Sequence, residues 1–132
     1  MTDTVDPRLQ TRATELFGVR FPIVQTGMGW VAGASLVSGT ANAGGLGILA
    51  SATMTFDEMV EAIDEVHERT DKPFGVNFTI LENKKYKKQM DDWMHISAEE
   101  GVKFFLTSLG KPDRIVAFAK PKGIKIYHDV HT

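Results

Sequence analysis

Cysteine is absent from this 132-residue sequence, and its absence removes several kinds of chemistry at once. Without cysteine the chain can form no disulfide, carry no thiolate nucleophile and build no cysteine-based metal site. A large excess of one charge is also missing, because 15 basic residues stand against 17 acidic ones and the formal net charge is −2. This balance gives no reason to expect a nucleic acid or a membrane surface as a partner.

Long hydrophobic runs are missing as well. No apolar stretch approaches the roughly 20 residues that span a bilayer. The segment from Met1 to Leu9 is polar and acidic and lacks the apolar region of a secretory signal, so a cytoplasmic protein is the expectation. The hydrophobic share of 42% is ordinary for a globular protein, and 132 residues are enough for one domain with a core of its own.

Short apolar segments recur along the chain and are bounded by glycine or proline. Segments of this length, rich in β-branched and aromatic residues, are typical of strands that are buried on both faces of a parallel sheet. The predicted strands lie near residues 21–26, 46–50, 74–79, 102–107 and 124–128.

Amphipathic segments between these strands are expected to form helices. The clearest covers residues 55–70, where Thr55 and Glu58 have the spacing of a capping box. Gly44 and Gly101 are expected to end two of the others. The remaining predicted helices cover residues 33–43, 83–100 and 112–120.

The alternation of strands and helices predicts right-handed βαβ units around a parallel sheet. A spacing of roughly 20 to 30 residues between strands fits a (β/α)8 barrel, which typically needs about 250 residues. The chain supplies about half of that length. The predicted fold class is therefore α/β, an incomplete barrel of the TIM type with about five strands and four helices.

Three sequence blocks accompany the first three predicted strands. They are Gln25-Thr26-Gly27-Met28-Gly29, Ala43-Gly44-Gly45-Leu46-Gly47, and Asp71-Lys72-Pro73-Phe74-Gly75-Val76-Asn77-Phe78. In order and at suitable spacing, these blocks resemble the nitronate monooxygenase (2-nitropropane dioxygenase) family and its flavin-dependent enoyl-reductase-like relatives. The resemblance is strong over residues 16–78 and weaker beyond them.

This resemblance implies an FMN-dependent oxidoreductase that oxidises nitronates or related small substrates. Two alternatives stay open. One is a flavin-dependent enoyl-CoA-type reductase or dehydrogenase of the same family, whose substrate is a CoA thioester. The other is an inactive half-barrel that only self-associates. The resemblance also divides the chain into an N-terminal extension, residues 1–15, and the amino-terminal half of an FMN-binding barrel, residues 16–132.

The resemblance further implies that Thr26, Gly27, Met28 and Asn77 contact FMN. In such a barrel the active site lies at the carboxyl ends of the strands. Glycine there lets the backbone approach a flat ring, and free amides can bond its polar edge. We expect Gly27, Met28 and Asn77 to share one rim, because parallel strands point their carboxyl ends the same way. The structural alternatives are a tight turn at Gly27 and a loop cap at Asn77.

His128 follows the fifth predicted strand and is a candidate for catalytic proton transfer, because histidine titrates near neutral pH. A substrate contact and an exposed side chain are the alternatives for this residue. No pair of histidines or cluster of carboxylates has the spacing of metal ligands, so no metal site is predicted.

A lysine-rich patch lies in the third predicted helix. Its members are Lys84, Lys85, Lys87 and Lys88. We interpret it as a solvated helix face, with contact to a phosphate or to CoA as the alternative.

Two departures from the family pattern bear on the substrate. Nitronate oxidisers often carry Phe-His-Phe-Gly after the fourth strand, where this chain has Leu106-Thr107-Ser108-Leu109-Gly110. The Ala-Gly-Gly-His segment that holds the family's histidine base does not occur in these 132 residues. A positioned general base is worth about 10²- to 10⁴-fold in rate. We therefore expect oxygen uptake with a nitronate to be far below a family-like rate, and these departures favour the reductase-like branch.

The isolated chain is predicted not to be a stable monomer. A half-barrel cannot close, so its first and fifth strands are both edges, and exposed apolar edges pair with other strands. The partner can be a second copy, a chain carrying the other half, or an aggregate. The alternative is that residues 1–15 cover the edges. Size-exclusion chromatography with light scattering decides this, and a cooperatively folding monomer at micromolar concentration would contradict the prediction.

Overall fold

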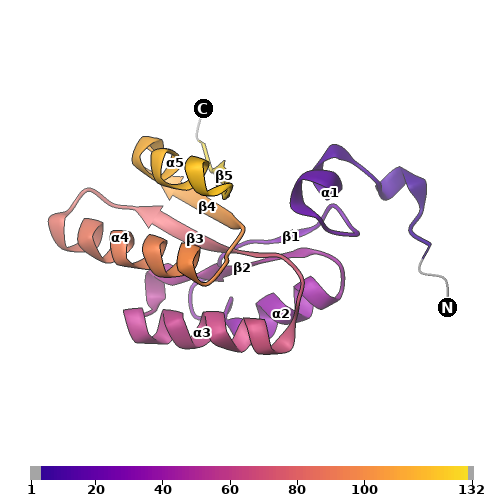
Figure 1. Cartoon of the computed structure of the whole chain (residues 1–132), viewed down its shortest axis with the longest axis horizontal. Helices are drawn as coiled ribbons and strands as arrows, with labels where there is room; N and C mark the ends of the chain where they lie inside the picture. The colour runs from indigo at the N-terminus through magenta and orange to yellow at the C-terminus, as the bar shows by residue number, and fades with distance from the viewer. Residues whose placement is uncertain (1–3, 131–132) are drawn as a thin grey trace.

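A five-stranded parallel sheet organises residues 4–130, the part of the chain that the computed structural model describes (Figure 1). Its strands are β1 (Val24–Gln25), β2 (Leu46–Ala50), β3 (Phe74–Ile80), β4 (Phe104–Leu109) and β5 (Lys125–His128). They lie in sequence order, and every neighbouring pair is parallel. The predicted parallel α/β fold, an incomplete barrel of five strands, is confirmed.

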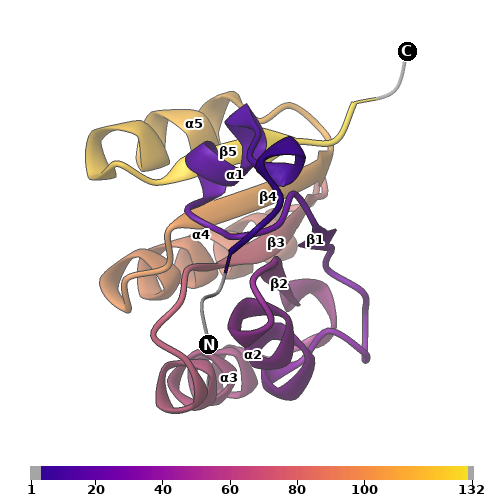
Figure 2. The same cartoon turned by 90° about the vertical axis from the view of Figure 1, so that its right-hand side faces the viewer.

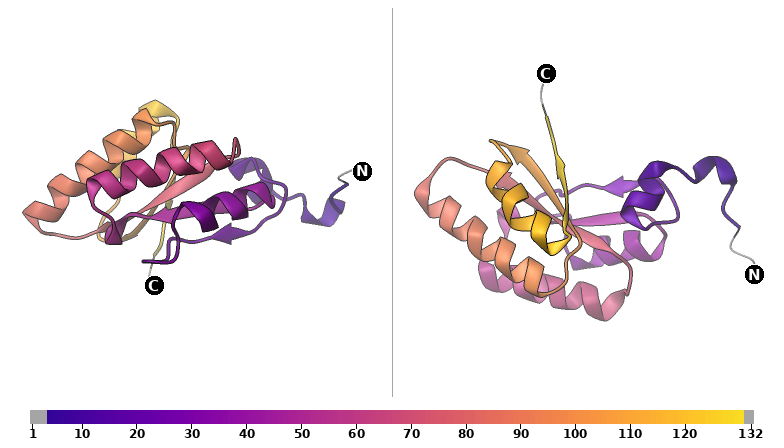
Figure 3. Two further views of the ribbon diagram at one scale, coloured as in Figure 1. Left: turned by 90° about the horizontal axis from the view of Figure 1, so that it is seen from below. Right: turned by 45° about the horizontal axis from the view of Figure 1, so that its top comes forward.

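One α-helix connects each strand to the next. These helices are α2 (Ala34–Asn42), α3 (Phe56–Arg69), α4 (Lys84–Glu99) and α5 (Asp113–Ala119), and each lies within a residue or two of its predicted range. The capping box of α3 is present, since the Glu58 amide donates to Thr55 Oγ1 at 3.2 Å and the Thr55 amide donates to Glu58 Oε2 at 2.7 Å. Seen from below, α2, α3 and α4 lie side by side against the sheet (Figure 3).

A further helix, α1 (Arg12–Phe17), precedes the sheet and was not predicted. It begins with a capping box in which Thr14 takes the place that glutamate usually holds, so the pattern is easily overlooked in sequence. The helix crosses the expected boundary between residues 15 and 16, and the division of the chain there stays a prediction. Within residues 4–130 there are also three 3₁₀ turns, at Pro7–Leu9, Ser51–Thr53 and Lys120–Lys122.

The first strand is much shorter than its apolar segment. Pro22 has no N–H to donate to a ladder, and the Ile23 amide donates to the Phe21 carbonyl at 2.7 Å in a tight turn. Regular pairing therefore begins only at Val24.

The fourth strand is shifted by two residues toward the C-terminus relative to its predicted range. Gly101 has φ +78°, and the Val102 amide donates back to the Ser97 carbonyl at 2.9 Å. This backward hydrogen bond belongs to the end of α4 and uses the Val102 amide, so the strand begins only after Val102. At the other end, Ser108 and Leu109 pair with Thr79 and Ile80 and lengthen the strand.

The main core lies between the sheet and α2 to α5. Alternate strand residues point toward these helices and meet their apolar stripes. Trp93 of α4 is 1% exposed, and Phe78 and Phe105 are fully buried, with ring centroids 4.8 Å apart. We call this side of the sheet the outer face.

The other side, which we call the inner face, carries a smaller apolar cluster. Its members are Leu46, Ile48 and Phe104, with Phe17, Val19, Leu106 and Tyr127 packed against them. Helix α1 lies apart from the four outer helices (Figure 1) and in front of β4 and β5 in the view of Figure 2. It reaches this face through Phe17, whose ring centroid is 4.9 Å from that of Tyr127. Lys125 Nζ also donates to the Leu16 carbonyl at 2.7 Å. The N-terminal segment thus covers part of the inner face.

The N-terminal segment leaves the edge at β1 more exposed than the inner face. Ile23 is 62% exposed and Val24 is 37% exposed. Exposed apolar side chains on an edge strand agree with the predicted tendency to associate, and the oligomeric state itself stays a prediction.

Gly47 allows β2 and α2 to pack closely, and this contact generates a stability prediction. A Cβ on Gly47 would lie 2.5 Å from the Val37 carbonyl oxygen, so Gly47→Ala is expected to lower the free energy of unfolding by about 1–3 kcal/mol. Gly39 lies inside α2 with nothing within 4 Å of such an atom, and Gly39→Ala is expected to raise it by about 0.5–1 kcal/mol. Urea denaturation measures both, and equal stability of the two variants would contradict the argument.

Candidate functional site

Gly27 and Asn77 meet at the carboxyl rim of the sheet. Gly27 follows β1, and Asn77 lies in β3 on the inner face, between the outward-facing Val76 and Phe78. A Cβ on Gly27 would be 2.6 Å from Asn77 Cβ, so the backbone of one residue packs directly on the side chain of the other. The predicted proximity of these two residues is confirmed. Met28 follows in the same loop with 41% of its surface exposed.

The contact with Asn77 explains the glycine. Gly27 does not have a positive φ, so its conformation is open to other residues and a left-handed turn does not require glycine here. Asn77 does not cap a loop either, since it pairs within β3 and its Nδ2 donates to the Leu106 carbonyl at 3.0 Å. The loop cap at Asn77 is therefore wrong, whereas a tight turn does follow Gly27, since the Met28 carbonyl accepts from the amides of Val31 and Ala32.

Polar side chains tie the strands together at this level. Gln25 Nε2 donates to the Ile48 carbonyl at 3.1 Å and joins β1 to β2, as Asn77 joins β3 to β4. Within the part of the chain that the structure describes, Asn77 Oδ1 receives no hydrogen bond. The rim is thus held in place, while the amide oxygens of Asn77 and Gln25 have no donor among the described residues, and Asn77 Oδ1 can accept from a ligand.

Backbone amides are also available at this rim. Among residues 4–130, the N–H groups of Gly27 and Met28 have no acceptor, whereas the Met28 carbonyl accepts from the Ala32 amide at 2.7 Å. Unpaired backbone donors beside an open surface suit a ligand with hydrogen-bond acceptors along one edge.

Trp30 is a feature of this rim that sequence reasoning missed. Its φ is +59° and its side chain is 91% exposed. Leu109, at the end of β4, has φ +64° and is 53% exposed. Residues held in this region are strained and tend to gather at functional sites. The available signal was an aromatic residue placed directly after the glycine-containing block that follows β1.

His128 lies on the other face of the sheet. Its Nδ1 is 2.8 Å from Oγ1 of Thr107, which is completely buried on the outer face. Strand alternation puts His128 on the same side as Ile126, which packs against the outer core. The structure therefore does not bring His128 to Gly27 and Asn77, and this placement argues against its proposed catalytic role.

Tyr127, the neighbour of His128, does face inward. Burial raises the pKa of its phenol above the ordinary value, so the group is neutral at pH 7. In the described residues its hydroxyl has no hydrogen-bond partner. A neutral phenol of this kind can donate a hydrogen bond but does not act as a base near neutrality.

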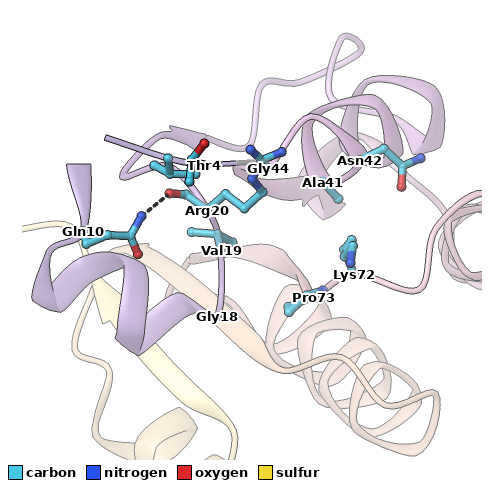
Figure 4. A pocket seen from close by; sticks show the side chains of 11 residues that line it. Thr4, Gln10, Gly18, Val19, Arg20, Ala41, Asn42, Gly44, Lys72 and Pro73 are labelled. Atoms are coloured by element: carbon cyan, nitrogen blue, oxygen red, sulfur yellow. Dashed lines mark hydrogen bonds between the residues drawn. The ribbon is translucent and has the colours of Figure 1, made fainter. Parts of the chain in front are cut away.

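Two cavities lie at opposite ends of the sheet. Figure 4 shows one of about 630 Å³ beside the segment that leads into β1; residues lining it are Gly18, Val19, Arg20, Gly44, Lys72 and Pro73. There Gln10 Nε2 donates to the Arg20 carbonyl at 3.3 Å. This cavity is at the amino ends of the strands, where conserved contacts of such folds serve stability more than catalysis. The other, of about 480 Å³, lies between α4 and α5 at the carboxyl ends.

Residues 4–130 contain no group of three histidine, aspartate or glutamate side chains arranged to hold a metal ion. None of the helices described is long and apolar enough to cross a membrane.

The family model for nitronate monooxygenase matches residues 10–126. The chain belongs to the nitronate monooxygenase family. Curated relatives include a protein of Mycobacterium tuberculosis named 5-hydroxy-7a-methyl-1-oxo-octahydro-1H-indene-4-carboxyl-CoA dehydrogenase, which is 51% identical over 88% of this chain. The protein of the same name from Rhodococcus jostii is 70% identical over 52% of the chain. A probable nitronate monooxygenase of Staphylococcus saprophyticus is 34% identical over 66% of the chain.

Two solved structures show the same fold as this chain. FabK from Thermotoga maritima superposes with a TM-score of 0.83 at 34% identity, covering 93% of this chain and 38% of that one. The nitroalkane oxidase of Streptomyces ansochromogenes superposes with a TM-score of 0.78 at 22% identity. The matched region covers 92% of this chain and 43% of the oxidase chain. The chain spans 31% of the Mycobacterium tuberculosis relative and 20% of the Rhodococcus jostii relative.

The pairing of Thr107 with His128 can be tested by a double-mutant cycle. Thr107→Val and His128→Ala are each expected to lower the free energy of unfolding. Either substitution removes the same hydrogen bond, so the loss in the double variant is expected to be smaller than the sum of the two single losses, by a coupling energy of about 0.5–1.5 kcal/mol. Urea denaturation of the two single variants and the double variant gives this number. Strictly additive effects would mean that the side chains do not interact.

Proposed function

We propose that this chain is the FMN-binding amino-terminal part of an oxidoreductase that acts on a small organic substrate. The observation that carries the proposal is the contact of Gly27 with Asn77 at the carboxyl rim, beside backbone donors that have no acceptor in residues 4–130. Membership in the nitronate monooxygenase family supports it.

The residues at this rim fit a flat ring with a polar edge. Gly27 lets its loop pack directly on Asn77, and its amide and that of Met28 can donate to ring acceptors. Asn77 can accept through Oδ1 while its Nδ2 stays bonded to Leu106. Thr26 joins them as the residue between β1 and Gly27. Bound FMN would supply the redox chemistry, and these residues would bind and orient it.

His128 is left out of the proposed site. Its hydrogen bond to Thr107 and its position on the outer face separate it from the rim residues by the thickness of the sheet. We therefore assign to His128 a structural role in joining the ends of β4 and β5.

A CoA thioester is the substrate class that the relatives favour. The two proteins named as carboxyl-CoA dehydrogenases are 51% and 70% identical to this chain over their matched lengths, against 34% for the probable nitronate monooxygenase. Leu106 to Gly110, where nitronate oxidisers often have Phe-His-Phe-Gly, agrees with this preference. Nitronate oxidation, the activity that names the family, is the second candidate.

The inner face of the sheet is only partly covered, whereas the interior of a complete barrel is enclosed by strands on all sides. Leu46, Ile48 and Phe104 form an apolar surface there that α1 covers only in part. We infer that further strands, from a longer protein or from a second copy, pack against the edges at β1 and β5 and complete the site.

Flavin binding tests the proposal directly. The purified chain, supplied with FMN, is expected to retain flavin absorbance through gel filtration. Gly27→Ala is expected to abolish that binding, because the added methyl group collides with Asn77 and displaces the rim. Asn77→Ala is expected to weaken FMN binding about tenfold, since one hydrogen bond to the ligand is lost.

Gly33→Ala is the matched control for Gly27→Ala. A Cβ on Gly33 meets nothing within 4 Å, so this variant is expected to bind FMN as the unmodified chain does. Circular dichroism establishes that the three variants keep their helices. Unchanged FMN affinity in Gly27→Ala would refute the assignment of the rim.

A further inference from the structure

The cavity between α4 and α5 combines positive charge with an apolar floor. It occupies about 480 Å³ at the carboxyl ends of β3 and β4, where the loops leading into the two helices lie at the same end of the sheet (Figure 1). Four cationic residues line it, and they are Lys84, Lys87, Lys111 and Arg114. Two carboxylates, Glu82 and Asp113, line it as well, so the cavity has a formal charge of +2 in a chain of net charge −2.

The lysines of the cavity have no ion-pair partners in residues 4–130. Lys84, Lys87 and Lys111 form no salt bridge there, although Lys88, one residue further along α4, pairs with Asp92 at 3.1 Å. The lysines of this helix thus lie on two different faces, because residues three apart share a face and adjacent residues do not. Lys84 and Lys87 point to the cavity, while Lys85 and Lys88 do not line it.

Arg114 adds a fixed cation. Its Nη1 donates to Asp91 at 2.5 Å, which anchors the guanidinium between α5 and α4. Its Nη2 is buried and has no hydrogen-bond partner in the described part of the chain. One end of the group is therefore held in place while the other has unused donor capacity, an arrangement suited to an anion.

The floor of the cavity is apolar. Met90 and Ile115 are 3% and 1% exposed, and Ile80 lies beside them at the end of β3. Leu81 is 40% exposed at the same place. This lining suits a ligand that combines a flat aromatic base with several negative charges, as the nucleotide end of coenzyme A does.

We propose that this cavity binds the phosphate-bearing nucleotide end of a CoA thioester, with Lys84, Lys87 and Lys111 contacting the phosphates. This inference rests on the proposed function, because it names the substrate class of the rim formed by Gly27 and Asn77. The position is suitable, since Asn77 and Ile80 are three residues apart on β3, about 10 Å along the strand. The flexible arm of the thioester can cross from the cavity to the rim over the end of this strand.

The test compares two charge-matched double variants of the full chain. Isothermal titration calorimetry at fixed ionic strength measures binding of CoA and of adenosine 3′,5′-bisphosphate. Lys84→Gln with Lys87→Gln is expected to weaken both about tenfold or more, because charge-assisted contacts to the phosphates are lost. Lys85→Gln with Lys88→Gln removes the same charge from the same helix and is expected to change affinity less than about threefold. Equal losses in the two double variants would overturn the proposal.

A second measurement needs no variant. CoA is expected to protect Lys84, Lys87 and Lys111 of the unmodified chain from an amine-reactive reagent, as read by mass spectrometry, while Lys85 and Lys88 stay reactive. The chain has no cysteine, so the CoA thiol cannot form a mixed disulfide with it. Equal labelling of all five lysines with and without CoA would overturn the proposal.

Competition with FMN separates this inference from the proposed function. FMN is expected to bind together with CoA and to keep its affinity in Lys84→Gln with Lys87→Gln. Displacement of CoA by FMN would mean that the cavity takes the flavin phosphate, and the proposal about CoA would be wrong. Binding of CoA by a chain that does not bind FMN would instead refute the proposed function and leave the cavity assignment standing.

Discussion

Parallel pairing of the strands in sequence order is the constraint from which the other features of this molecule follow. Each parallel connection needs a crossover, and here every crossover is a helix on the same face of the sheet. The carboxyl ends of all strands therefore lie along one rim, which brings Gly27 to Asn77. The inner face is left to α1 and to whatever completes the barrel.

The rim combines rigidity with unused hydrogen-bonding capacity. Asn77 and Gln25 bridge neighbouring strands through their amide nitrogens, so the positions of both side chains are fixed by the sheet. Trp30 is held nearby in a strained backbone conformation with its ring exposed. A preorganised surface of this kind loses little conformational entropy when a planar ligand binds, which is how a scaffold of strands supports a cofactor site.

Two separate regions lie at the carboxyl ends of the strands, namely the inner rim and the cavity between α4 and α5. In the proposed function the inner rim presents backbone amides and an amide oxygen to the flavin ring, and in the further inference the cavity between α4 and α5 presents unpaired lysines to phosphates. Separating a reactive centre from a charged anchoring site lets binding energy from a remote part of a substrate orient the reacting part. The end of β3, from Asn77 to Ile80, connects the two regions.

The sequence by itself determined the number and order of the strands and the extent of the crossover helices, because apolar periodicity, capping residues and glycine stops act over a few neighbouring residues. It also indicated that Gly27 and Asn77 share a rim, since parallel topology follows from the alternation of elements. Only the tertiary structure decided which face His128 occupies, because strand alternation reverses with a shift of one residue. Likewise, only the packing of α4 against α5 separated Lys84 and Lys87 from Lys85 and Lys88, since a cavity between two helices is a property of neither helix alone.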